Sequence, residues 1–174
     1  MMNKKIVLAV CGSVAAIETP KIARELRRKG YDIECVMSEA AQKIIHPNVM
    51  EWASGNKVIT EITGRVEHVS LCGIDGEAAL LLVCPCTSNT ISKTACGIED
   101  TPVTTMAATA LGSGTPIVMV PAMHLAMYQN PFVKENIKKL LDKGIHMIEP
   151  ECEESKAKIA DKEKIIKKSV DVMR

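Results

Sequence analysis

Four consecutive polar side chains form the segment of this sequence most suited to bind a ligand. They occupy Thr87–Thr90, directly after the apolar run Ala79–Cys84 and before a helix-like stretch that ends at Gly97. A buried strand that opens into a polar turn and then a helix presents N–H groups, hydroxyls and an amide to a ligand. The same residue types also cap helices that bind nothing, so the segment alone fits a binding site and a redundant cap equally well.

A second turn with ligand-binding potential follows the apolar run Ile6–Val10. It contains Gly12, Ser13 and Val14 but not the GxGxxG pattern, and no acidic residue stands where a dinucleotide ribose would need one. The turn therefore favours a mononucleotide phosphate, held by N–H groups and hydroxyls. A glycine at such a turn also meets a purely steric need, so this turn is weak evidence by itself.

These turns are positioned by apolar runs that alternate with helical patterns. The predicted strands are Ile6–Val10, Ile33–Met37, Val58–Ile62, Ala79–Cys84, Pro116–Val120 and Met147–Ile148. The predicted helices include Ile17–Lys29, Glu39–Ile45, Thr101–Leu111, Pro131–Lys143 and Lys162–Met173. Continuous apolar strands separated by helices are typical of a parallel sheet covered on both faces. We therefore expect a single α/β domain over residues 1–174, Rossmann-like (flavodoxin-like), with a parallel sheet of about six strands.

The topology of such a sheet predicts where a ligand would bind. Ligands sit beyond the carboxyl ends of parallel strands, so the turns that follow the strands should converge there. The turns expected to meet are residues 11–14, 38–39, 85–90 and 121–128.

Charge and composition exclude several classes of function. Lys and Arg total 22 against 21 Asp and Glu, so the net charge indicates neither a nucleic acid nor an anionic membrane as partner. The apolar run behind Lys4 and Lys5 is too short for a secretion signal or a membrane span. We expect a cytoplasmic protein.

Seven cysteines are scattered through the chain without CxxC spacing. Most are expected to be small buried residues in a reducing compartment, and neither a disulfide nor a metal site is predicted. Cys152 is the expected exception, because it lies in an acidic segment outside any apolar run, where its thiol would be accessible. Two of the histidines, His46 and His146, are predicted to be structural.

The residues at the turns resemble a known family at several places, in the same order. Residues 12–16 (GSVAA) look like the GSIAA turn of the homo-oligomeric flavin-containing cysteine decarboxylases. Pro85–Thr90 and Gly97–Asp100 resemble that family's PASANT and GIAD stretches, and Pro121–Tyr128 resembles its PxMNxxMW segment. His68 matches the family's active-site histidine in a similar context. Together the matches span most of the chain and are far more specific than any one motif.

The most similar branch is phosphopantothenoylcysteine decarboxylase of coenzyme A biosynthesis. The resemblance implies FMN-dependent oxidation of 4′-phosphopantothenoylcysteine to a thioaldehyde, loss of carbon dioxide, and reduction to 4′-phosphopantetheine. It implies His68 and Cys152 as catalytic residues, with the cysteine as proton donor in the last step. The implied FMN contacts are Gly12, Ser13, Val14, Ser38, Thr87, Ser88, Asn89, Thr90 and Ala122. The implied substrate contacts are Asn89, Met123, His124 and Lys156.

The resemblance also implies an assembly. We expect a homotrimer, or a dodecamer of trimers, with the flavin near the subunit boundaries. The apolar composition of Thr101–Leu111 favours such contacts between subunits. The chain ends where the synthetase half of the bifunctional relatives would begin, so we expect a separate phosphopantothenate-cysteine ligase as a partner.

Two departures from the family pattern bear on the substrate. His124 replaces an asparagine thought to hold the substrate carboxylate, and Tyr128 replaces a tryptophan, although a histidine can still donate to a carboxylate. An FMN electron carrier or reductase of the same fold is an alternative. A flavin prenyltransferase ranks lower, because the segment after the fifth strand has no arginine-containing stretch. A non-catalytic regulatory subunit would tolerate the loss of His68 or Cys152, and neither is lost.

Overall fold

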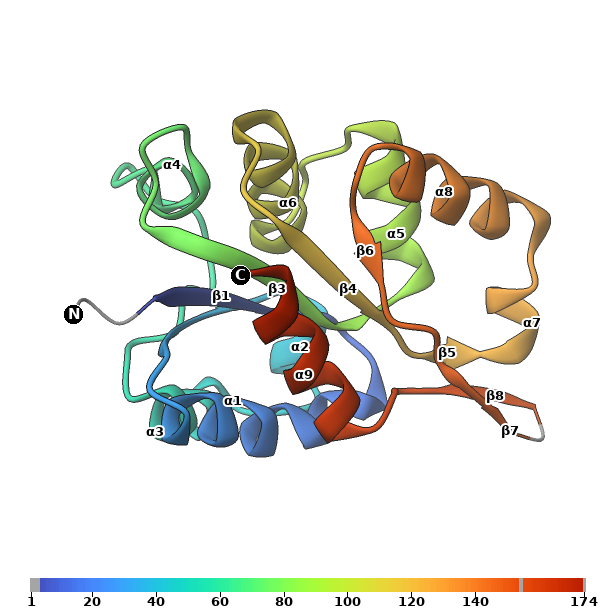
Figure 1. Ribbon diagram of the computed structural model, residues 1–174, viewed down its shortest axis with the longest axis horizontal. Coiled ribbons are helices and arrows are strands. Elements are labelled where there is room, and N and C mark those ends of the chain that lie inside the picture. Colours follow the sequence, from blue (N-terminus) through green and yellow to red (C-terminus); the bar gives the residue numbers. More distant parts are fainter. Residues whose placement is uncertain (1–3, 154, 174) are drawn as a thin grey trace.

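Five parallel strands form the centre of the structure, a computed structural model that describes residues 4–153 and 155–173 (Figure 1). Their order across the sheet is β2-β1-β3-β4-β6. The strands are β1 (Lys5–Val10), β2 (Asp32–Met37), β3 (Ala78–Cys86), β4 (Ile117–Pro121) and β6 (His146–Met147). Every neighbouring pair is parallel, so the strands all end at the same edge of the sheet.

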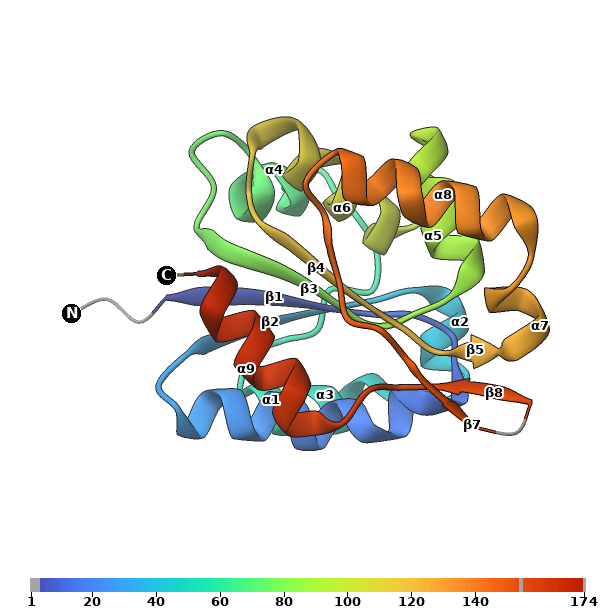
Figure 2. The ribbon, with the colours of Figure 1, turned by 45° about the vertical axis from the view of Figure 1, so that its right-hand side comes forward.

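Both faces of this sheet are buried, because its strands are apolar along almost their whole length. In β1, Ile6 and Leu8 belong to one core and Val7 and Ala9 to the other. The first face is covered by α1 (Thr19–Arg28), α3 (Pro47–Ser54) and α9 (Lys162–Val172) (Figure 2). The second face is covered by α4 (Glu67–Cys72), α5 (Ser88–Cys96), α6 (Pro102–Ser113) and α8 (Pro131–Asp142). The predicted α/β architecture is therefore confirmed.

Side-chain caps begin the helices that flank the carboxyl edge of the sheet. Thr87 caps α5 by accepting a hydrogen bond from the Thr90 N–H, and Thr101 forms a reciprocal capping box with Thr104 at α6. The short helices are the 3-10 turn η1 (Val14–Glu18), α2 (Glu39–Gln42) and α7 (Leu125–Tyr128). None of the described helices has both the length and the apolar character that a membrane crossing requires.

A second, antiparallel sheet lies beside α7 (Figures 1 and 2). Its strands, in spatial order, are β5 (Met123–His124), β8 (Lys156–Lys158) and β7 (Glu151–Glu153). We refer to these three strands together with α7 as the antiparallel unit. Strands of two or three mostly polar residues lack a hydrophobic period, so the sequence did not predict this unit.

The main sheet has five strands rather than about six. The predicted strand Val58–Ile62 is wrong, since its only ladder contact among the described residues is a parallel bridge from Ile59 to Val36. Thr60 and Glu61 follow directly, and polar residues do not extend a strand into a buried layer.

Helix boundaries also differ from the prediction. α1 begins at Thr19 after a 3-10 turn rather than at Ile17, because Pro20 stands in its first turn, where proline favours a helix start. α2 ends at Gln42 rather than at Ile45. Both α3 and α4 escaped prediction, because each is short and only weakly periodic in sequence.

Most cysteines are buried, as predicted: Cys11, Cys35, Cys72, Cys84 and Cys86. Cys152 is exposed on β7. The prediction that Cys152 is the one exception is wrong, however, because Cys96 at the end of α5 is exposed as well.

Candidate active site

A cavity of about 440 Å³ opens at the carboxyl edge of the main sheet. The turns after β1, β2 and β3 converge around it, which is the arrangement predicted from the topology. Its lining residues are Gly12, Ser38, Glu39, Ala40, Lys43, Thr87, Ser88, Asn89, Thr90, Thr101 and Met127. Most of the predicted cofactor contacts therefore meet around one cavity.

The turn after β3 places polar groups at different depths. Ser88 and Thr90 are buried, whereas Asn89 is exposed. Thr87 Oγ1 accepts a hydrogen bond of 3.3 Å from the Thr90 N–H and shares another, of 3.2 Å, with the Thr90 hydroxyl. The N-terminus of a helix carries N–H groups without helical acceptors and a partial positive charge, so the start of α5 favours an anionic ligand group.

The turn after β1 lies against α2. A Cβ atom at Gly12 would stand 2.4 Å from the Cβ of Ala40, closer than side chains tolerate. The Ser38 N–H donates to the Val10 carbonyl at 3.1 Å, and the Ser38 hydroxyl accepts a hydrogen bond of 3.2 Å from the Ala41 N–H. Gly12 therefore permits the close approach of α2, which brings Ser38 to the cavity.

Glu39 and Met127 lie in turns that were predicted to converge here, whereas sequence reasoning missed the lining residues Ala40, Lys43 and Thr101. Lys43 Nζ pairs with Glu39 Oε1 at 2.7 Å. The four-residue spacing of these opposite charges, directly after the Ser38 cap, could have indicated the pair from the sequence. Thr101 reaches the cavity only through the tertiary arrangement of α6, for which no local pattern exists. Lys43 is the positively charged residue of the described lining, and the Glu39 carboxylate that it pairs with lines the cavity as well.

Buried cysteines lie next to Thr90, one of the residues that line the cavity. The Thr90 hydroxyl donates a hydrogen bond of 3.3 Å to Cys11 Sγ, and Cys11 is also hydrogen-bonded to Cys86. Burial raises the pKa of the Cys86 and Cys84 thiols, so both stay protonated. Cys84 and Cys86 are therefore neutral side chains rather than reactive groups, whereas the hydrogen bond from Cys86 lowers the pKa of Cys11.

The antiparallel unit brings four predicted site residues together. Met123 and Cys152 both pair with Ala157 of β8, one from each side, and His124 pairs with Lys156. Directly paired residues project to the same face of a sheet. Met123 and Cys152 consequently share one face, while His124 and Lys156 share the other.

α7 connects this unit to the cavity through Met127. His124 caps α7, because its Nδ1 atom accepts a hydrogen bond of 3.2 Å from the Ala126 N–H. A neutral imidazole that accepts at Nδ1 carries its proton on Nε2, so His124 keeps one N–H for a ligand. His46 caps α3 in the same way, which fits its predicted structural role.

Several predicted site residues lie outside the cavity. Ser13 caps η1, and Val14 on that turn is 74% exposed. Ala122, which directly precedes β5, is only 3% exposed. His68 lies half-buried on α4, and its Nδ1 atom is buried with no hydrogen-bond partner among the described residues. Within one chain, neither His68 nor Cys152 lines the cavity.

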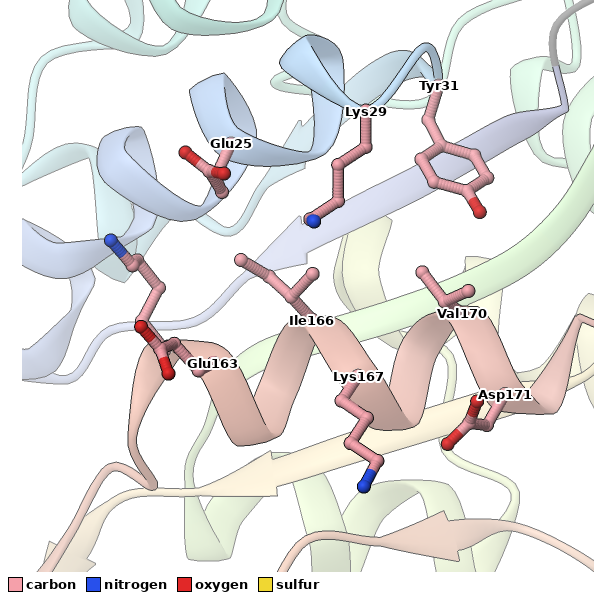
Figure 3. Close-up of a pocket in the computed structure, with 9 residues that line it drawn as sticks. Glu25, Lys29, Tyr31, Glu163, Ile166, Lys167, Val170 and Asp171 are labelled. Atoms are coloured by element: carbon pink, nitrogen blue, oxygen red, sulfur yellow. The ribbon is translucent and has the colours of Figure 1, made fainter.

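A separate groove of about 570 Å³ lies between α1 and α9 (Figure 3). Lys29 and Tyr31 extend toward Ile166 and Val170, and the groove contains no predicted site residue. Within residues 4–153 and 155–173, no three His, Cys, Asp or Glu side chains gather as metal ligands would.

The sequence model of one protein family, described as Flavoprotein, matches residues 1–174. The chain belongs to the Flavoprotein family.

Flavoprotein family relatives differ in length from this chain. The coenzyme A biosynthesis bifunctional protein CoaBC of Thermococcus kodakarensis is 58% identical over 167 residues, which are 95% of this chain and 41% of that protein. This chain thus spans about two fifths of the length of that relative. The probable phosphopantothenoylcysteine decarboxylase of Streptococcus mutans is 34% identical, and the match covers 86% of this chain and 84% of that protein.

Solved structures of similar proteins share the fold. The FMN-dependent cysteine decarboxylase SpaF superposes with a TM-score of 0.84 at 27% identity, covering 98% of each chain. The peptidyl-cysteine decarboxylase EpiD gives a TM-score of 0.83 at 23% identity, covering 97% of this chain and 99% of that one. The predicted Rossmann-like Flavoprotein fold is thereby confirmed.

Proposed function

We propose that this chain is an FMN-dependent decarboxylase that converts 4′-phosphopantothenoylcysteine to 4′-phosphopantetheine. The proposal rests above all on the cavity, where hydroxyl and N–H donors from three turns meet Met127 of the unit that also carries His124 and Cys152. Membership of the Flavoprotein family and the similarity to a relative named as a phosphopantothenoylcysteine decarboxylase support the same reaction.

The chemistry of the lining fits FMN. The hydroxyls of Ser38 and Thr87 and the start of α5 suit a phosphate, and Lys43 adds a positive charge. The Asn89 amide suits the polar edge of a flavin ring, and Met127 offers apolar contact in a lining without described aromatic residues. Bound there, FMN supplies a reversible two-electron oxidation of the substrate's cysteinyl side chain. The other proposed contacts are Gly12, Ser13, Val14, Ser88, Thr90 and Ala122.

Donors that suit the anionic substrate lie on the antiparallel unit. The Nε2–H of His124 can donate to a carboxylate, so the change from asparagine retains a donor at this position. The Lys156 ammonium, paired with His124 across β5 and β8, suits a phosphate. Met123, on the other face beside Cys152, offers a flexible apolar contact.

Cys152 supplies the proton that the product requires. Loss of carbon dioxide breaks the bond to the carboxylate carbon and leaves its electron pair on the substrate as an ene-thiolate. Forming the product then requires a hydride equivalent and a proton. The hydride equivalent would come from the FMN that was reduced in the oxidation step, and the exposed Cys152 thiol of β7 can deliver the proton and regain one from water.

We also propose a homotrimer, or a dodecamer of trimers, with the FMN site near a subunit boundary. His68 does not line the cavity of its own chain, whereas a neighbouring copy can present it there. The helix that carries it also exposes apolar side chains in and around it, at Val66, Val69 and Ile74. The apolar composition of Thr101–Leu111 favours a different helix, α6, as the contact surface between subunits. Two of its apolar residues, Met106 and Ala107, are however buried within this chain.

The experiment that tests this function is an anaerobic incubation of the FMN-loaded protein with 4′-phosphopantothenoylcysteine. Carbon dioxide release over many turnovers without net flavin reduction is the expected result. Flavin reduction only by a protein donor, without carbon dioxide, would instead identify the electron-carrier alternative. A protein that fails to take up FMN on titration would overturn both.

The resemblance further implies a partner and a location. A separate phosphopantothenate-cysteine ligase would supply the substrate, and its binding to this protein is testable by co-sedimentation of the two purified proteins. The cytoplasmic location stays a prediction, which fractionation of the source cells can check.

A further inference from the structure

The antiparallel unit carries a polar contact that the proposed reaction has not used. The hydroxyl of Tyr128, the last residue of α7, donates a hydrogen bond of 2.9 Å to Glu149 Oε2. Glu149 lies in the short connection between β6 and β7, two residues before β7 begins. The contact therefore joins α7 to the segment that leads into the strand of Cys152.

Hydrogen bonds to two other elements fix the backbone around Glu149. The N–H of its neighbour Ile148 donates to the Met119 carbonyl of β4 at 3.0 Å, and Lys164 Nζ of α9 donates to the Glu149 carbonyl at 3.4 Å. Its backbone is thus attached to the main sheet and to α9. Its carboxylate, by contrast, is exposed and is directed by Tyr128.

The strand that carries Cys152 is held to β8 by its ladder and by an ion pair between Glu153 and Lys158. β7 is the outer strand of the small sheet and pairs only with β8 among the described strands. β8 is held in turn by β5, and the Leu125 N–H donates to the Ser155 carbonyl at 2.8 Å. These bonds hold the far side of the hairpin. On the side where β7 enters, the Tyr128–Glu149 contact adds a link to α7 beside the backbone bonds made by Ile148 and Glu149.

We propose that Tyr128 and Glu149 form a tether that positions Cys152 relative to Met127 and the cavity. Tyr128 is thus a positioning residue rather than a catalytic one, and this inference rests on the proposed decarboxylase function. Because Met127 and Tyr128 are consecutive, a contact that fixes the Tyr128 ring to the entry of β7 also fixes the spacing between the cavity wall and the thiol.

The electrostatic surroundings keep this tether intact. Burial raises the pKa of Tyr128, and the Glu149 carboxylate and the nearby Cys152 raise it further. The hydroxyl therefore retains its proton at every pH at which the protein is expected to act.

The test compares variants that remove only the tether. Tyr128→Phe deletes the hydroxyl and keeps the ring, whereas Glu149→Ala deletes the acceptor. Glu149→Gln keeps an acceptor oxygen and should restore most of the effect. The matched control is Tyr31→Phe, which deletes the other tyrosine hydroxyl of the chain, in the groove between α1 and α9 (Figure 3).

We expect Tyr128→Phe and Glu149→Ala each to lower kcat by about tenfold while KM changes by less than about twofold, because the tether places the proton donor and not the substrate. The double variant should be no worse than either single variant, since both remove one contact. FMN affinity and oligomeric state should be unchanged, as in Tyr31→Phe.

A second measurement needs no turnover. In a Cys96→Ser background, the rate of Cys152 alkylation by iodoacetamide should rise several-fold in Tyr128→Phe and Glu149→Ala but not in Glu149→Gln or Tyr31→Phe. Unchanged alkylation rates in all variants, or equal loss of kcat in Glu149→Gln and Glu149→Ala, would overturn the tether. An absence of decarboxylation in the unmodified protein would instead overturn the proposed function, and the alkylation rates would still judge the tether.

Discussion

The Thr90 hydroxyl donates a hydrogen bond of 3.3 Å to the Cys11 sulfur, which joins the start of α5 to the turn after β1 beneath the cavity. The same hydroxyl shares a hydrogen bond with Thr87, the cap of α5. One buried side chain thus holds two of the three turns that form the candidate FMN site.

Thr90→Val should therefore weaken FMN binding. The variant keeps the shape of the side chain but leaves the Cys11 and Thr87 groups without this partner, at a cost of about 1 kcal/mol in unfolding free energy. FMN affinity should fall by about fivefold or more, measured by fluorescence titration of the apoprotein. Thr94→Val is the control, because Thr94 donates to the Thr90 carbonyl on the same helix but does not line the cavity. Equal affinities for the two variants would contradict this role.

Gly12→Ala should disrupt the site by displacing α2. The new Cβ would lie 2.4 Å from Ala40 Cβ, so α2 has to move together with Ser38 and Lys43. We expect a loss of about 1–3 kcal/mol in stability, which is typical of overpacking, and a weaker FMN complex. Gly112→Ala is a matched control on α6, because a Cβ at that position would meet no other atom within 4 Å and alanine favours a helix. A thermal shift assay with and without FMN checks both variants.

Cys152→Ser should separate the steps of the proposed reaction. The variant retains the cavity and is expected to release about one equivalent of carbon dioxide per site and then stall, since the proton donor is missing. Rapid quench with labelled substrate measures this single turnover. Cys96→Ser, which alters the other exposed cysteine, should continue to turn over. Steady turnover by Cys152→Ser would show that the thiol is not the proton donor.

His68→Asn and Cys152→Ser should complement each other if each site takes these residues from two copies. Co-expressed in equal amounts, the two inactive variants should regain about a quarter of the unmodified activity by random assembly in a symmetric oligomer. If one chain supplied both residues of a site, no activity would be recovered, because every chain in the mixture lacks either His68 or Cys152. Light scattering on the same samples reports the assembly state.

Glu34→Gln should stabilise the protein at neutral pH. Burial raises the pKa of this carboxyl on β2, an effect that Lys5 opposes and that Asp32 and Glu77 reinforce. A raised pKa means that the folded state binds more protons than the unfolded state, so charged Glu34 costs stability at neutral pH and the cost disappears as pH falls below its ordinary value of 4.5.

The gain of Glu34→Gln should accordingly vanish in acid, as measured by urea unfolding across pH. Glu77→Gln is the opposite control, because it removes the 2.7 Å ion pair with Lys5. Its loss should be small, about 0.2–1 kcal/mol, since the pair is partly exposed. A stabilising effect of both variants would refute the assignment of burial as the cause.

Local patterns in the sequence were sufficient for most of the fold. Apolar runs such as Ile6–Val10 identify strands that are buried on both faces, and a cap such as Thr87 marks the start of a helix, because both depend on residues close together in the chain. The convergence of Gly12, Ser38 and Thr87–Thr90 followed from parallel topology alone.

Other features depended on contacts between distant segments. The polar strand β8 is formed by its pairing with β5 on one side and with β7 on the other, so no period in residues 151–158 predicts these strands. Thr101 reaches the cavity through the packing of α6, while Ile59, predicted as part of a strand, forms only a bridge.

The amino-acid sequence by itself therefore determined the parallel sheet, the turns at its carboxyl edge and the chemical character of the cavity, because residue type and spacing specify these locally. Only the tertiary structure decided that Tyr128 bonds to Glu149 just ahead of the strand that carries Cys152, and that His68 stays outside the cavity of its own chain. The physical reason is that such positions are set by pairing and packing between segments far apart in the chain, where local propensity carries no information.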